Sequence, residues 1–173
     1  MNEYEFTLKF AIPADLEAET LEDRLFEAGC DDALVGLGQR GRLALHFSRA
    51  EDSAEAAITS AIQGVQTAVP RARLVEAGPD LVGMTEMAEL FGFSRQNMRK
   101  LVQRHGDVFP LPVHEGRQAL WHLADVLDWF ANQRQRPMDP ALREVARAGM
   151  AVNVRQQVER LALHQGDSTE LTD

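Results

Sequence analysis

The sequence lacks several features that would assign it to a specialised class of protein. Cys30 is its single cysteine, so it can form neither an internal disulfide framework nor a cysteine-based zinc cluster. Its apolar runs are only a few residues long, well short of the roughly 18 residues that span a bilayer. The first ten residues, MNEYEFTLKF, contain no basic segment followed by an apolar stretch, so we expect no secretory signal. The expectation is a soluble cytoplasmic protein.

Aromatic residues are scarce and charge is unevenly distributed. Aromatics make up 6% of the 173 residues against 45% for all hydrophobic residues, so aliphatic side chains must provide most of the core. The net charge of −9 comes almost wholly from residues 1–80, which hold 7 basic and 15 acidic residues, whereas residues 81–135 hold 6 of each. Four cations of the middle segment fall within ten positions: Arg95, Arg99, Lys100 and Arg104. Local charge decides what a surface can bind, so the acidic total does not exclude nucleic acid.

The first eighty residues alternate between strand and helix patterns. From Tyr4 to Ile12 every second side chain is apolar, which is typical of a strand with one buried face. The expected strands cover residues 4–12, 33–37, 42–48 and 72–77, and the expected helices cover residues 15–28 and 54–69, the second capped by Asp52 or Ser53. This β-α-β-β-α-β order resembles the ferredoxin-like sandwich, with two helices covering one face of an antiparallel sheet. We expect residues 1–79 to form this acidic domain.

The uncovered face of that sheet carries Glu5, Thr7 and Lys9. It is expected to be solvated or to dock a partner. Self-association, binding of an effector and contact with another protein all remain open for this domain, because a fold alone does not determine function.

Two short helical patterns follow. Thr85 is expected to cap a helix over residues 86–91, and Gly92 to form a tight corner after it. Ser94 is then expected to cap a second helix over residues 95–104. Two short helices joined by a glycine-containing turn are typical of the helix-turn-helix motif.

The second helix has one apolar side and one polar side. At about 100° per residue, Met98, Leu101 and Val102 point inward. The opposite side contains no Asp or Glu, whereas an ordinary solvated helix mixes the two signs of charge. Arginine and glutamine also bind the edges of guanine and adenine through paired hydrogen bonds. We therefore predict that residues 95–104 form a recognition helix that enters the major groove of DNA.

A hairpin is expected behind this helix. The prolines of residues 109–113 favour an extended chain, residues 114–117 read as a tight turn, and residues 118–121 as the returning strand. Arg117 at the tip is a candidate phosphate contact. A helix over residues 122–132 then closes the small core, with Trp121 and Trp129 as packing residues. The residues expected to contact DNA are Thr85, Ser94, Arg95, Gln96, Asn97, Arg99, Lys100, Gln103, Arg104 and Arg117.

The segment from Met84 to Leu101, MTEMAELFGFSRQNMRKL, resembles the helix-turn-helix of AlpA-like and excisionase-like regulators within the wider MerR-like winged group. The run FPLPV from Phe109, followed by Trp121 and by DVLDW from Asp125, is similar to the strand and closing helix of the AlpA pattern. The resemblance covers about a third of the chain. It implies a winged helix-turn-helix domain over residues 80–135 that binds double-stranded DNA.

The tail is expected to form one more helix, within residues 137–165, with Asp139 as its cap and Pro140 as its first residue. Its apolar stripe changes direction along its length, which argues against a long regular coiled coil. We expect this helix to pack on the sandwich or on a second subunit. Residues 166–173 read as a frayed polar tail.

No catalytic or metal site is expected. Catalysis requires a nucleophile beside a base, or converging metal ligands. His105, His114 and His122 have neither acidic nor thiol companions at suitable spacing, so we expect them at the surface or near DNA. Cys30 is expected to be a buried small residue, and the adjacent Asp31 and Asp32 a solvated turn. The stretch GLGQRG lies between two expected strands rather than before a helix, so it predicts a turn and not a phosphate loop.

The sequence thus predicts an α+β, sequence-specific bacterial DNA-binding protein, a transcriptional regulator acting as a homodimer, without a cofactor and without enzymatic activity. One alternative is an excisionase-type architectural factor that bends DNA. Another is an interaction adaptor whose winged domain and acidic sandwich both bind protein. The acidic domain is also a possible internal brake that occupies the basic helix.

Overall fold

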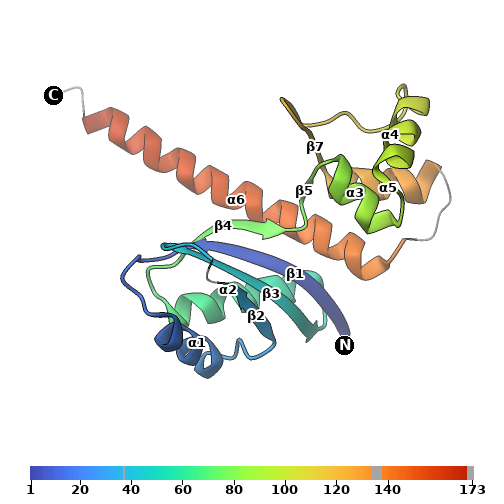
Figure 1. Cartoon of the computed structure of the whole chain (residues 1–173). Helices are drawn as coiled ribbons and strands as arrows, with labels where there is room; N and C mark the ends of the chain where they lie inside the picture. The colour runs from blue at the N-terminus through green and yellow to red at the C-terminus, as the bar shows by residue number, and fades with distance from the viewer. Residues whose placement is uncertain (37, 134–137, 171–173) are drawn as a thin grey trace.

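The computed structural model describes residues 1–36, 38–133 and 138–170, with the backbone alone for residues 167–170. Within these ranges the protein is α+β, with six helices and antiparallel sheets (Figure 1). In chain order the elements are β1 (Asn2–Ala11), α1 (Ala18–Glu27), β2 (Ala33–Gly36), β3 (Arg42–Glu51), α2 (Ala54–Ala68), β4 (Arg73–Gly78), β5 (Leu81–Val82), α3 (Met84–Phe91), α4 (Arg95–Arg104), β6 (His114–Glu115), β7 (Ala119–His122), α5 (Leu123–Gln133) and α6 (Pro140–Glu170).

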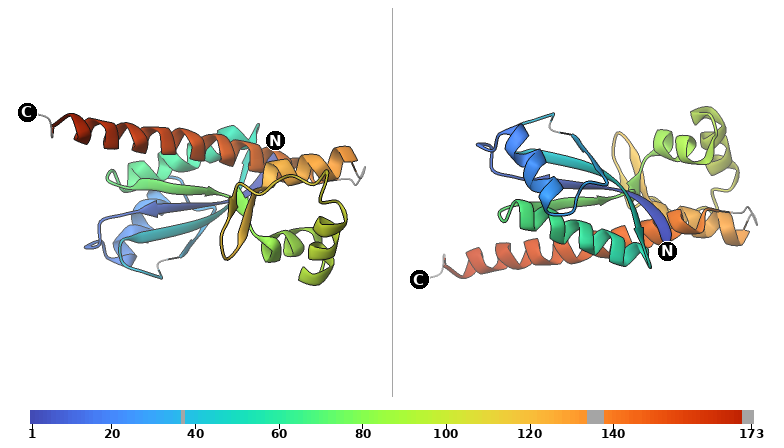
Figure 2. Two further views of the ribbon diagram at one scale, coloured as in Figure 1. Left: turned by 90° about the horizontal axis from the view of Figure 1, so that it is seen from above. Right: turned by 90° about the horizontal axis from the view of Figure 1, so that it is seen from below.

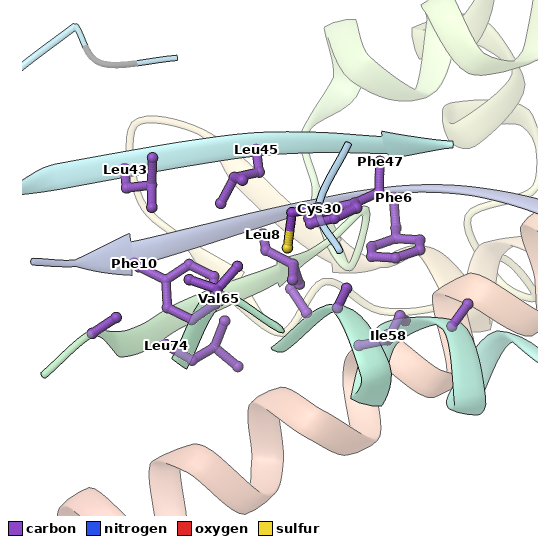
Figure 3. Packing of buried hydrophobic residues seen from close by; sticks show 14 of the residues in the cluster. Phe6, Leu8, Phe10, Cys30, Leu43, Leu45, Phe47, Ile58, Val65 and Leu74 are labelled. Carbon is purple, nitrogen blue, oxygen red and sulfur yellow. The ribbon is translucent and has the colours of Figure 1, made fainter. Parts of the chain in front are cut away.

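The first sheet has the strand order β2-β3-β1-β4, and every neighbouring pair is antiparallel. The alternation in β1 has the predicted effect: Tyr4, Phe6, Leu8 and Phe10 are at most 1% exposed. Phe6 lies opposite Phe47 of β3, and the two rings stack 5.1 Å apart. Side chains from β1, β3 and β4 point to the side of the sheet where α2 and α6 lie (Figure 3). The other face carries exposed side chains, among them Glu5, Lys9 and His46, and among the described residues no helix contributes to a core on that side.

The ends of the first two helices differ partly from expectation. Ser53, one of the two predicted caps, accepts a hydrogen bond from the backbone N–H of Ala56 at 3.1 Å. The first helix begins at Ala18 and not at Asp15, because a turn closed by a bond from the N–H of Leu16 to the carbonyl of Pro13 comes first. The β3 strand runs three residues beyond the predicted end at Ser48, since it stays paired with β1 as far as Glu51.

The second core lies between α3, α4, α5 and a small antiparallel sheet of order β5-β7-β6. Its centre is aromatic, with the ring of Trp129 4.9 Å from Phe109 and 5.1 Å from Phe130. The strand β5, which pairs with β7, was not predicted. Its two residues are too few to show an alternating pattern.

The last helix joins the two cores. Val145 and Val152 of α6 belong to the first core, whereas Ala146 belongs to the second. As predicted, α6 begins at Pro140, and the carboxylate of Asp139 accepts a bond from the N–H of Ala141 at 3.0 Å. The C-terminal end of the helix extends beyond the sheet (Figures 1 and 2).

The predicted extent of the tail is wrong at its C-terminal end. The helix continues to Glu170 rather than ending at Gln165, so residues 166–170 are helical and not frayed. Gly166 alone does not break the hydrogen-bonded turns, since a single glycine lowers helix stability by only about 1 kcal/mol. Some predicted positions lie outside the described residues: residue 37 of the strand 33–37, residues 134–135 of the second domain, residue 137 of the tail helix and residues 171–173 of the tail. In the part of the chain that the structure describes, no helix is both long and apolar enough to cross a membrane.

Candidate nucleic-acid interface

The pair α3 and α4 is held by a sharp corner and a side-chain cap. Gly92 has φ of 70°, a left-handed conformation that favours glycine, and it ends α3 as predicted. The hydroxyl of Ser94 accepts a hydrogen bond from the N–H of Asn97 at 3.1 Å. Because this cap satisfies an N–H at the start of the helix, α4 begins at Arg95. The helix ends at Arg104, so both of its ends lie where they were predicted.

The predicted cap of the preceding helix is wrong. Helix α3 begins at Met84, and its N-cap is Gly83, which makes no side-chain cap bond. Gly83 is extended at the end of β5, and its carbonyl accepts the first helical bond from Met87 at 3.0 Å. Thr85 therefore lies inside the first turn, with an exposed side chain.

All ten residues predicted to contact DNA are exposed. Helix α4 rests on Met98, which is 0% exposed, while Leu101 and Val102 are only half-buried. Its outer side carries Gln96, Lys100 and Gln103 and no carboxylate. Among the described residues, none of the cations of α4 forms an ion pair. Their charge is therefore free to meet a polyanion.

Four of the predicted residues come together in one groove, of about 660 Å³. Thr85 comes from the first turn of α3, Arg95 and Arg99 from one side of α4, and Arg117 from the hairpin. Arg95 and Arg99 are four residues apart, so both point along the same side of the helix. Glu86 is the one carboxylate among the lining residues, against three arginines. The groove is therefore lined by cations of α4 and of the hairpin and by the first turn of α3.

The remaining predicted residues do not line this groove. Gln96, Lys100 and Gln103 point away from Met98, and Asn97 and Arg104 lie on the far shoulder of α4. Gln118, which was not predicted, does line it. Gln118 could have been predicted from the sequence, because it directly follows Arg117 at the tip of the expected hairpin.

The hairpin differs from its predicted register. His114 and Glu115 form β6 and pair with β7, so the turn spans residues 116–118 instead of 114–117. Residues 114 and 115 form a strand instead of a turn because they pair with β7, where Leu120 lies opposite His114. The carbonyl of Leu120 also accepts a hydrogen bond from the N–H of Val113 at 2.8 Å. Arg117 remains exposed at the tip. The indole N–H of Trp121 donates to the carbonyl of Pro110 at 2.9 Å, which holds the extended segment against β7.

A buried polar junction connects this module to the rest of the protein. Asp80 is 2% exposed, and its carboxylate lies 2.6 Å from Nδ1 of His122 and accepts a bond from Nδ2 of Asn153 at 2.8 Å. The same Asn153 side chain both donates to and accepts from the backbone of Ala77, at 2.8 Å each. The expectation that His122 lies at the surface or near DNA is therefore wrong: it is half-buried and bonded to Asp80. No signal in the sequence places Asp80 and Asn153 together, since they are 73 positions apart.

The other polar candidates have structural roles. Asp31 and Asp32 form a turn and Asp31 is exposed, as expected, but Asp32 is half-buried, because Arg49 donates to both of its carboxylate oxygens, at 2.7 and 2.9 Å. Cys30 is 3% exposed, as expected, and burial raises the pKa of its thiol. The imidazole of His105 packs on Trp129, with the two rings 5.3 Å apart.

Neither a metal site nor an internal brake is visible in the described parts of the chain. No group of three or more His, Cys, Asp or Glu side chains lies close enough there to hold a metal ion. No acidic residue of the described part of the first domain pairs with α4. Comparison of the chain with protein-family models, with curated proteins and with solved structures gives no match.

Proposed function

We propose that the protein binds double-stranded DNA in a sequence-specific manner and acts as a bacterial transcriptional regulator. The observation that carries this proposal is the exposed, carboxylate-free outer side of α4, continuous with the groove that holds Arg95, Arg99 and Arg117. Helix α4 enters the major groove, where Gln96, Lys100 and Gln103 meet base edges. The groove and the hairpin tip lie against the phosphate backbone.

The arrangement of the elements supports this interpretation. A capped helix after a left-handed corner, followed by a hairpin and a closing helix, is the order expected of a winged helix-turn-helix. It agrees with the proposed relationship to AlpA-like and excisionase-like regulators. The antiparallel order β2-β3-β1-β4, with helices on one face, likewise agrees with a ferredoxin-like sandwich for the first domain. We propose both assignments.

The proposed functional unit is a homodimer. The module carries few cations, so one copy makes few phosphate contacts and binds weakly. Val154, Val158 and Leu161 of α6 are 48%, 61% and 57% exposed, and at about 100° per residue they lie on one side of the projecting helix. An exposed aliphatic row of this kind can pack against the same row on α6 of a second copy, which buries both rows in a symmetric dimer. Val158→Asp should convert a dimer to a monomer in light scattering, and a wild-type monomer would contradict this part of the proposal.

The DNA proposal is tested on the full-length chain with duplexes selected from random sequence. Binding is followed by fluorescence anisotropy over a series of salt concentrations. Arg99→Gln combined with Lys100→Gln should weaken binding by at least about tenfold, because a base contact such as that of Lys100 contributes about 1–3 kcal/mol and Arg99 adds a phosphate contact. The matched control is Arg24→Gln combined with Arg71→Gln, which removes the same charge from exposed sites of the first domain.

Two results would refute the proposal: a salt slope near zero, or equal losses in the test and control variants. A bend detected with circularly permuted fragments would assign the same surface to an architectural, excisionase-type role. Point variants are preferable to cutting the chain at Pro79, because Ala77 and Asp80 are both bonded to Asn153 of α6. A truncation would therefore disturb the fold as well as any inhibitory contact.

A further inference from the structure

The uncovered face of the four-stranded sheet carries a second cationic site, remote from α4. A hollow of about 680 Å³ lies where β1 ends and β3 and β4 begin, and Lys9, Arg42 and Arg73 line it. This is the end of the sheet opposite the one where β4 leads into β5 (Figure 1). We propose that this hollow binds a small polyanion bearing phosphate or carboxylate groups, as an effector of the protein.

The strand register brings the three cations to the same face. Ala11 lies opposite Arg42 on one side and Arg73 on the other, so the two arginines flank it in one row. Neighbouring strands are about 4.8 Å apart, which puts the two arginine backbones about 10 Å from each other. Lys9 is two residues before Ala11 and therefore points to the same face, about 7 Å along the strand. Side chains as long as these can converge on one ligand.

The floor of the hollow is made of small residues. Gly36 lies opposite Ala44, which in turn lies opposite Lys9, so the row beside the cations has almost no side-chain bulk. A Cβ placed on Gly36 would meet Ala44 only at 3.6 and 3.9 Å, which is ordinary contact distance. A ligand can therefore approach the strands closely between the cationic side chains.

The charge of the hollow is opposite to that of its domain. Residues 1–80 hold 15 acidic and 7 basic residues, yet no Asp or Glu lines the hollow. Lys9, Arg42 and Arg73 are exposed, and within the described ranges none of them forms an ion pair. The nearest carboxylate in the strand register is that of Glu76, which lies opposite Lys9 on β4 but does not line the hollow.

Unpaired like charges on one sheet face repel one another, and a bound anion would remove that repulsion. Arg49 of the same domain differs from these three cations, because its guanidinium group is already paired with both carboxylate oxygens of Asp32. Two guanidinium groups beside an ammonium suit a ligand with several anionic oxygens, because guanidinium binds phosphate and carboxylate groups through paired hydrogen bonds. The site shares no residue with the DNA surface, so either proposal can fail without the other.

The test titrates inorganic pyrophosphate and, separately, citrate into the full-length protein by isothermal calorimetry at low ionic strength. Binding of pyrophosphate alone would identify a phosphate ligand, and binding of citrate alone a carboxylate ligand. Arg42→Gln combined with Arg73→Gln should reduce the affinity for the bound probe at least tenfold. Gly36→Leu should reduce it as well, because it fills the floor without changing charge.

The matched control is Arg24→Gln combined with Arg160→Gln, which removes the same charge from exposed sites that line neither the hollow nor the groove beside α4 and should leave the affinity unchanged. The proposal would be overturned if neither probe bound at millimolar concentration. Equal losses in the two double variants, or unchanged binding in Gly36→Leu, would overturn it too, because both results indicate non-specific attraction. Binding of duplex DNA alone at the hollow would replace the small-ligand proposal with an extended DNA surface.

Discussion

The Asn153 side chain provides a quantitative test of how the two cores are joined. Its amide pairs with both the N–H and the C=O of Ala77, at 2.8 Å each, so it takes the place of a neighbouring strand at the edge of β4. A third bond of 2.8 Å reaches the buried carboxylate of Asp80. Asn153→Ala removes all three bonds at once and leaves Ala77, which is 0% exposed, with two unsatisfied backbone groups.

Each buried group left without a partner destabilises a fold by about 1–3 kcal/mol, so the two groups of Ala77 make Asn153→Ala lower the free energy of unfolding by about 2–6 kcal/mol. Urea unfolding followed by far-ultraviolet circular dichroism measures this change. Tryptophan fluorescence adds a local probe, because Trp121 and Trp129 both belong to the second core. In the variant the fluorescence transition should separate from the dichroism transition, since the junction between the cores is weakened.

Asn132→Ala is the matched control. Asn132 is exposed near the end of α5, so its loss should change the free energy of unfolding by no more than about 0.5 kcal/mol. If Asn153→Ala and Asn132→Ala unfolded at the same urea concentration, the buried junction would not hold the cores together. The explanation of Asp80 and Asn153 as structural residues would then be wrong.

Three further predictions concern single groups. Ser94→Ala should destabilise the protein by about 1 kcal/mol in urea unfolding through loss of the α4 cap, whereas Thr85→Ala should not, and equal effects would contradict the assignment of the caps. Burial raises the pKa of Asp128, but the hydrogen bonds from Arg143 and Arg147 outweigh it, and the net pKa lies below the ordinary 3.8. Its ion pairs therefore stabilise the fold above that value and are lost as the pH falls through the lowered pKa. The urea midpoint of Asp128→Asn should accordingly fall less than that of the wild type between about pH 6 and about pH 3, and parallel curves would refute this. The Cys30 thiol, buried and with a raised pKa, should react with a thiol reagent at neutral pH only after unfolding, and rapid reaction of the native protein would refute its burial.

Sequence reasoning succeeded where structure depends on neighbours in the chain. The period of two in β1 predicted its buried face, and Ser94 predicted the first residue of α4, because both signals lie within a few positions. The exposure of the α4 cations followed from the same local pattern, since Met98 defines the inward side. These elements carry the candidate site.

The rest depends on contacts between distant segments. Thr85 has a suitable side chain for a cap, but pairing of β5 with β7 moves the start of α3 to Gly83. Asp80 resembles an ordinary loop residue beside Pro79, and only its bonds to His122 and Asn153 show otherwise. The groove could not be predicted either, because Arg117 reaches Arg95 and Arg99 through the folding of the hairpin.

The return of α6 to the first core has a consequence for synthesis on the ribosome. Val145 and Val152 complete a cluster whose other buried members all lie before residue 78, so the first domain finishes only after the second has been made. A nascent chain that has just released α5 still exposes the surface of Leu74 and Tyr4 that α6 later covers, because Tyr4 also donates to Glu144 at 2.8 Å. Synthesis that stops before α6 therefore yields two incomplete domains, and the N-terminal domain can complete its core only once α6 has been made as far as Val152.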